Sequence, residues 1–187
     1  MAICKPTIRR VAKKDSYLLG FAGNEIDPKN GLIYVACVAD KLAKGAYYVP
    51  HGSFAARPDC IYLKTPSGYE PRKGARFHPG GEELTHDLGS GPDFKNANVL
   101  LSTDFRYFGK DRVAIDSGPY RALATFVHSI GVGHRVNFSP TLANSIVQFV
   151  NHVFTLKQPK TPVPTHRTET RCDRDDTYEH VSCRRRD

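Results

Sequence analysis

The sequence has no tryptophan and one methionine. It also has no apolar run as long as the roughly 18 residues that a membrane-spanning helix needs. Its first residues, Met1 to Pro6, lack the apolar core of a secretory signal peptide. These absences argue against a membrane-spanning or a secreted protein.

Cysteine patterns that hold metals or disulfides are missing as well. The chain has 5 cysteines, an odd number, and none of them shows the Cys-x-x-Cys spacing of common zinc sites. We therefore expect reduced thiols, a cytoplasmic protein and no metal site. A tetrahedral alternative in the C-terminal stretch has spacings that match no familiar zinc pattern; its residues are His166, Cys172, His180 and Cys183. No nucleophile elbow, Walker loop or dinucleotide fingerprint occurs either, so the sequence points to no particular cofactor and leaves the cofactor unknown.

The chain is strongly basic. Its 187 residues include 27 Lys and Arg against 19 Asp and Glu, which gives a net charge of +8 and a pI near 9.3. Such a charge raises the local concentration of polyanions and speeds their encounter with the protein. Nucleotides or DNA are the partners that we expect, and an anionic membrane is the weaker option. The alternative is a soluble protein whose basic charge has no specific partner.

The composition changes at about Leu156. Before it, apolar segments alternate with loops, whereas residues 157–187 contain few apolar side chains and are rich in charge and proline. Such a stretch buries too little apolar surface to offset the entropy of ordering it. We predict one domain over residues 1–156 and a flexible charged tail over residues 157–187.

Several short segments predict strands. Residues 17–21 and 31–38 flank a stretch dense in turn formers, which predicts a β-hairpin. The second of these strands is apolar on both faces, so we expect it to be central. Residues 60–63 and 98–101 are further strand candidates, and the Gly- and Pro-rich segment 66–92 between them is predicted to be a long loop.

Two helices are predicted near the end of the domain. One is opened by Ser117-Gly118-Pro119 and has apolar residues at helical spacing up to Ile130. The other begins at Ser139-Pro140, the favoured N-cap and first-turn pair. The fold class expected is α+β: a small mixed or antiparallel sheet, optionally barrel-like, with these two helices packed on it.

The N-terminal segment is a candidate phosphate-binding site. Residues 4–14 hold five cations and no acid. Arg9 and Arg10 offer forked donors suited to phosphate, and Lys5 adds a point charge. Cys4 lies beside these cations, which would lower its thiol pKa and suit a nucleophile. The alternatives are a solvated helical face for the cations and a buried structural role for Cys4.

The segment between the two helices is a second candidate site. Gly133 permits a positive φ, and backbone N–H groups near it, together with the start of the following helix, favour an anion. His134 and Arg135 lie beside this glycine. The alternative is an ordinary turn with a C-capping glycine at Gly131.

Two further segments carry chemistry-bearing side chains. After the strand at 98–101, Asp104 is a candidate general base or a hydrogen-bond acceptor for a base edge, and Tyr107 is a candidate base-stacking residue. The alternative is that Asp104 caps a turn and the neighbouring phenylalanines belong to the core. In the long loop, the segments 76–81 and 85–87 contain histidines and an acid, and we interpret both as solvated loop.

Several motifs resemble one known family. They are the segments Ala2-Ile3-Cys4-Lys5-Pro6, Ile8-Arg9-Arg10, Asp15 to Gly20, Leu32-Ile33-Tyr34, Val99 to Ser102, Tyr107-Phe108-Gly109 and Gly133-His134-Arg135. In this order they resemble the second type of the nucleotide modification associated domains, over about residues 1–156. The resemblance implies a place in phage or bacterial systems that make unusual DNA bases. Tyr17 occupies a position where that family has tryptophan.

Three functions remain open at this point. In the first, the protein binds a nucleotide or DNA as a component of a base-modification system. Its phosphate ligands would then be Arg9, Arg10, His134 and Arg135. In the second, it is an enzyme acting on a modified nucleotide, with Asp104 or His134 as general base and Cys4 as nucleophile. In the third, it is a non-catalytic module that binds partner proteins of such a system through its tail.

Overall fold

The computed structural model describes residues 1–2, 4–75, 78, 80–115, 118–131 and 133–157. These residues form two compact units within the predicted domain. Unit 1 consists of residues 1–16 and 38–103, and unit 2 of residues 17–37 and 104–157. No helix among the described residues has the length and apolar character needed to cross a membrane.

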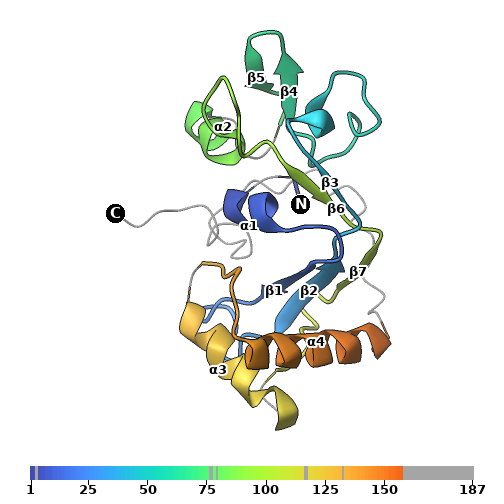
Figure 1. Cartoon of the computed structure of the whole chain (residues 1–187), viewed down its shortest axis with the longest axis vertical. Coiled ribbons are helices and arrows are strands. Elements are labelled where there is room, and N and C mark those ends of the chain that lie inside the picture. Colours follow the sequence, from blue (N-terminus) through green and yellow to red (C-terminus); the bar gives the residue numbers. More distant parts are fainter. Residues whose placement is uncertain (3, 76–77, 79, 116–117, 132, 158–187) are drawn as a thin grey trace. The chain divides into compact units, whose positions relative to one another are not determined.

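Unit 2 contains a three-stranded antiparallel sheet and two helices (Figure 1). Its elements are β1 (Tyr17–Phe21), β2 (Leu32–Cys37), β7 (Asp104–Tyr107), the short 3-10 helix η2 (Gly118–Tyr120), α3 (Arg121–Ile130) and α4 (Pro140–Thr155). The strand order is β1-β2-β7. The predicted hairpin and the central position of its second strand are therefore confirmed, with Tyr17 opposite Cys37 across the β1–β2 pair.

The core of unit 2 lies between β2 and the two helices. Its fully buried side chains include Leu32 and Val35 of β2, Leu123 of α3 and Phe149 of α4. This confirms the prediction of two helices packed on the sheet. Ser139 caps α4 as expected, because its side chain accepts a hydrogen bond from the Leu142 N–H. The predicted cap at Ser117 lies outside the described residues.

Unit 1 holds two short sheets and two helices. Its elements are α1 (Pro6–Val11), β3 (Asp40–Leu42), the 3-10 helix η1 (Ala46–Tyr48), β4 (Tyr62–Thr65), β5 (Gly68–Pro71), α2 (Gly81–Leu88) and β6 (Val99–Leu101). β3 pairs with β6 and β4 pairs with β5, both antiparallel. The described strands of the whole chain thus form small open antiparallel sheets, and none of these sheets closes into the barrel that we had allowed for.

The predicted long loop over residues 66–92 was wrong, because it contains β5 and α2. β5 completes a hairpin in which Thr65 faces Gly68. In α2 the apolar side chains that pack against the core are Leu84 and Leu88. Leu88 contributes to a core that is rich in tyrosine, with Tyr48 and Tyr62 fully buried. Two apolar residues in an eight-residue helix give too weak a periodicity to distinguish it from a loop.

Candidate functional site

Cys4 is held in a strained turn immediately before α1. Its φ is 56° and that of Lys5 is 43°, so two consecutive non-glycine residues adopt the left-handed region. Each such residue costs on the order of 1–3 kcal/mol, and such strain concentrates at functional sites. Two buried groups hold the turn: the Cys4 N–H donates to Asp87 Oδ1 at 2.8 Å, and the Cys4 carbonyl accepts from Arg9 Nε at 2.8 Å.

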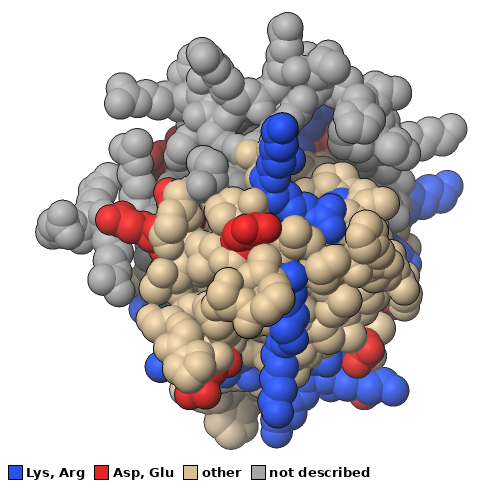
Figure 2. All heavy atoms as spheres, turned by 90° about the horizontal axis from the view of Figure 1, so that it is seen from above, with Lys and Arg blue, Asp and Glu red and all other residues tan. Residues whose placement is uncertain are grey.

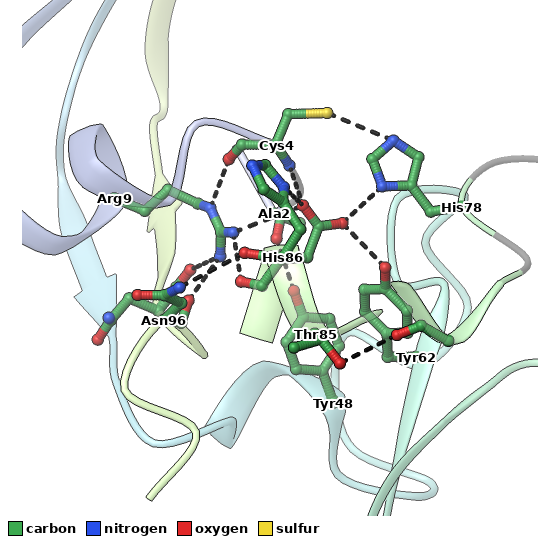
Figure 3. A network of polar contacts seen from close by, with 12 residues as sticks. Ala2, Cys4, Arg9, Tyr48, Tyr62, His78, Thr85, His86 and Asn96 are labelled. Atoms are coloured by element: carbon green, nitrogen blue, oxygen red, sulfur yellow. Dashed lines mark hydrogen bonds and ion pairs between the residues drawn. The ribbon is translucent and has the colours of Figure 1, made fainter. Parts of the chain in front are cut away.

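His78 contacts Cys4 with one ring nitrogen and Asp87 with the other, and Figure 3 shows its imidazole turned toward the Cys4 sulfur. Its Nε2 is 3.4 Å from Cys4 Sγ, and its Nδ1 is 2.7 Å from Asp87 Oδ2. Because a carboxylate only accepts hydrogen bonds, the proton of a neutral His78 lies on Nδ1. Nε2 then presents its lone pair to the thiol. His78 also has a positive φ of 52°, and its side chain is 13% exposed.

Asp87 lies in the last turn of α2 and is fully buried. Burial alone would raise the pKa of its carboxyl. Hydrogen bonds from His78, Tyr62 and the Cys4 N–H outweigh burial, so the pKa of Asp87 is held below its ordinary value and the group stays ionised. The side chain of His86, which is half exposed, approaches Oδ1 at 3.5 Å. Asp87 is thus a buried anion that can orient His78 and stabilise its positive charge.

Arg9 is the buried cation beside this anion. Its guanidinium donates to main-chain carbonyl oxygens of three segments, those of Cys4 at 2.8 Å, Asp87 at 2.6 Å, and Asn96 and Asn98 at 2.9 and 2.7 Å. Arg9 Nη2 also lies 3.9 Å from Asp87 Oδ1. Burial lowers the pKa of Arg9, but an arginine remains protonated at any pH of interest. Arg9 therefore ties the Cys4 turn to α2 and to the segment before β6.

Tyr62 completes the surroundings of Asp87. Its hydroxyl donates to Asp87 Oδ2 at 2.9 Å, the same oxygen that His78 contacts. Burial, followed by the charge of Asp87, raises the pKa of Tyr62, so the phenol stays protonated and remains a donor. The neighbouring Tyr48 is equally buried but donates to the Ala2 carbonyl instead.

The same three side chains could also form part of a metal site, since one ligand atom of each of Cys4, His78 and Asp87 lies within 4.8 Å of the others. The hydrogen bonds argue against Asp87 as a ligand. Its Oδ1 accepts from the Cys4 N–H and its Oδ2 contacts both His78 and Tyr62. This leaves Cys4 and His78, fewer than the three protein ligands of a typical catalytic zinc site. The arrangement fits a thiol–imidazole–carboxylate triad better.

The sequence-predicted residues of the N-terminal segment belong to unit 1. Cys4 is part of the triad, and the partly exposed Lys5 follows it in the strained turn. Arg10 is exposed, whereas Arg9 is 0% exposed. A phosphate contact by Arg9 would require its guanidinium to release the carbonyl groups that it now holds. The phosphate role of these cations stays a prediction.

The other predicted residues belong to unit 2. Asp104 begins β7, is 61% exposed at its side chain and accepts a hydrogen bond from Arg106 at 3.1 Å. Tyr107 on the same strand is 43% exposed. Of the neighbouring phenylalanines, Phe108 belongs to the core and Phe105 is exposed. The catalytic role of Asp104 and base stacking by Tyr107 stay predictions.

The segment between α3 and α4 contains the remaining candidates. Gly131 caps α3 with a φ of 60°, as in the ordinary-turn alternative, and Gly133 has a φ of 152°. Arg135 is exposed and donates to the His134 carbonyl, and His134 is partly buried. The convergence of this segment with Arg9 and Arg10, which belong to the other unit, stays a prediction.

The sequence did not predict three residues of this site, namely His78 and Asp87 of the triad and Tyr62, which donates to Asp87. His78 and Asp87 were interpreted as solvated loop. This was wrong for Asp87, which is fully buried in α2, whereas His78 lies in a loop but has a side chain only 13% exposed. Tyr62 was assigned only to a strand. No local pattern marked them, because the contacts that bring them together join residues far apart in the chain, such as Cys4 and His78.

The fold and the site thus define an α+β protein with a partly buried Cys-His-Asp constellation. A family model described as nucleotide modification associated domain 2 matches residues 1–169, and the chain belongs to this family. The resemblance noted in the sequence is thereby confirmed. Neither a curated protein nor a solved structure matches the chain.

Proposed function

We propose that the protein is an enzyme of a nucleotide-modification system that attacks its substrate with the Cys4 thiol. His78 is the general base and Asp87 orients it. The single observation that carries this proposal is the continuous contact from Cys4 Sγ to His78 Nε2 at 3.4 Å and from His78 Nδ1 to Asp87 Oδ2 at 2.7 Å. The family supplies the setting, nucleotide modification.

The proposed step requires no oxidant or reductant. The Cys4 proton passes to His78 Nε2, and the thiolate forms a C–S bond with an electrophilic carbon of the substrate. The bond from that carbon to its leaving group breaks, and the leaving group takes the proton from Nε2. Water or an acceptor nucleophile then displaces the thiol. Asp87 stabilises the imidazolium that exists between these proton transfers.

A purely structural role for Cys4 explains less of the geometry. A buried structural cysteine requires neither a positive φ nor a histidine aimed at its sulfur. Cys60, which is buried in the same unit, shows the structural pattern, because its thiol contacts only main-chain carbonyls among the contacts found for it. Cys4 differs from Cys60 in both respects, and a buried carboxylate is aligned behind its histidine.

The first prediction concerns the reactivity of Cys4. At pH 6.5 iodoacetamide should alkylate Cys4 about ten- to hundredfold faster than an ordinary thiol, because an ordinary thiol with a pKa of about 8.5 is about 1% ionised there. His78→Gln should remove this advantage. Peptide mass spectrometry gives the rate at each cysteine, with Cys37 as internal reference.

His86→Gln is the matched control, because His86 also lies beside Asp87 but is half exposed and contacts Oδ1. It should leave the rate at Cys4 unchanged. A panel of nucleotides and modified nucleotides, incubated with the protein and followed by mass, then searches for a substrate or a Cys4 adduct. If Cys4 is alkylated at an ordinary rate and His78→Gln does not change that rate, Cys4 is not the nucleophile and the proposal is wrong.

A second candidate function, nucleic-acid binding without catalysis, is favoured by the net charge of +8. On the face shown in Figure 2, Lys and Arg side chains are interspersed with Asp and Glu. We expect binding to oligonucleotides to weaken with salt, because cations that contact phosphate release counterions. Arg10→Ala and Arg135→Ala should each reduce the salt slope by about 1.

Filter binding over a salt series measures this prediction, with Arg57→Ala as the control, since Arg57 is already paired with Asp59 at 3.3 Å. An affinity that responds neither to salt nor to Arg135→Ala would exclude this function. Salt-dependent binding combined with an ordinary Cys4 rate would leave binding as the better account of the protein.

A further inference from the structure

Two donors share one oxygen of the buried carboxylate. His78 Nδ1 lies 2.7 Å from Asp87 Oδ2, and the Tyr62 hydroxyl donates to the same oxygen at 2.9 Å. A hydrogen bond to a charged acceptor draws on the charge that the acceptor presents to its other partners. The Tyr62 hydroxyl and the His78 imidazole therefore compete for the charge on Oδ2.

We infer that Tyr62 is a positioning residue that weakens the hold of Asp87 on the His78 proton. The inference rests on the proposed function, since it describes how readily the general base of that site gives up a proton. Without this hydroxyl, Asp87 would present more negative charge to the imidazolium of His78. The protonated form of His78 would then be more stable, and its pKa would be higher. With the hydroxyl, His78 returns the proton to a leaving group more easily.

Other polar and titratable groups also surround Asp87 and His78. They are the Cys4 thiol and N–H from the N-terminal turn, the Arg9 guanidinium from α1, the Tyr48 hydroxyl from η1 and the His86 imidazole from α2. None of them donates to Oδ2 among the described contacts. Arg9 and the Cys4 N–H act at Oδ1, which leaves Tyr62 as the described side chain that shares the oxygen of His78.

Because Tyr62 is buried, its hydroxyl is the group that donates to Oδ2 at this position, and water does not take its place. Its side chain is 0% exposed, so no water replaces its hydroxyl without a rearrangement of the core. Tyr48, also 0% exposed, packs edge-on against Tyr62 with ring centroids 5.7 Å apart, but its hydroxyl donates to the Ala2 carbonyl at 2.6 Å. The two tyrosines thus form a natural pair in which a single hydroxyl contacts the carboxylate.

The test is an NMR titration of His78 in the full chain, with the resonance assigned by its loss in His78→Gln. In Tyr62→Phe we expect His78 to titrate about one pH unit higher than in the unchanged protein, because Oδ2 of Asp87 then presents its charge to the imidazolium without a competing donor. Tyr48→Phe removes a buried hydroxyl from the same core and should not shift the titration.

A second variant covers the case in which Tyr62→Phe fails to fold. Incorporation of 3-fluorotyrosine at position 62 keeps the ring and makes the phenol a stronger donor, so His78 should titrate lower. Equal shifts in the two Phe variants, or a downward shift in Tyr62→Phe, would overturn the inference. The NMR titration reads His78 directly, whereas alkylation reads Cys4. A shift with an ordinary Cys4 rate would therefore defeat the proposed function alone, and a fast Cys4 rate without a shift would defeat the inference alone.

Discussion

Replacing Asp87 with Asn is expected to lower turnover that depends on Cys4 by about 10⁴-fold, the effect that loss of the orienting carboxylate has in comparable triads. The asparagine amide has one acceptor oxygen, whereas Asp87 accepts through both. With that oxygen on the Cys4 N–H, its NH₂ group faces His78 Nδ1. The imidazole then carries its proton on Nε2 and cannot accept the thiol proton.

The measurement is the turnover of a substrate found in the nucleotide panel, together with the rate of Cys4 alkylation, which should fall to that of His78→Gln. Asp59→Asn is the matched control, because Asp59 also accepts a hydrogen bond from a buried tyrosine, Tyr47 at 2.6 Å, but does not contact the triad. Unaltered kinetics in a folded Asp87→Asn protein would show that His78 acts without Asp87.

Replacing Arg9 with Met is expected to reduce the free energy of unfolding by about 3–5 kcal/mol, because removing one partner of a buried ion pair leaves the other charge uncompensated. The change also removes the Arg9 hydrogen bonds to the carbonyl oxygens of Cys4, Asp87, Asn96 and Asn98, of which Asn96 keeps a bond from the Asn98 N–H. Methionine fills much of the volume of the arginine stem. The loss of unfolding free energy therefore measures the removal of the charge and of the hydrogen bonds, not the removal of packing.

Urea unfolding followed by circular dichroism measures this loss. Arg10→Met is the control, since Arg10 is the adjacent residue in α1 and is exposed. The free energy of unfolding of Arg10→Met should stay within about 0.5 kcal/mol of that of the unchanged protein, the usual range for surface substitutions. Similar losses in the two variants would mean that the buried position of Arg9 has no energetic consequence.

The parts of the fold that the sequence predicted are those with strong local patterns. The hairpin of β1 and β2 has turn formers between two apolar segments that contain aromatic residues, and α4 has a Ser-Pro start followed by apolar residues at helical spacing. α2 and β5 were missed because their few apolar residues pack against partners distant in sequence. Leu88, for example, meets Tyr62 in a core that no local period reveals.

The candidate site was predicted only in part, for a related reason. Cys4 was selected from its neighbours in sequence, but His78 is 74 residues away and Asp87 is 83 residues away. Arg9 and Arg10 look alike in a run of cations, yet one is buried and the other exposed. Arg9 is buried because it donates to main-chain carbonyls of segments distant in sequence. Every residue has such a carbonyl, so the sequence does not show which cation will be buried.

The Cys4 turn depends on groups that come much later in the chain. Arg9, five residues after Cys4, holds its carbonyl, but its other acceptors extend to Asn98. During synthesis Cys4 therefore leaves the ribosome before its partners His78 and Asp87, which follow 74 and 83 residues later. If Cys4 is the nucleophile that we propose, we expect nascent or misfolded chains to carry an ordinary thiol and the proposed chemistry to require a completed unit 1.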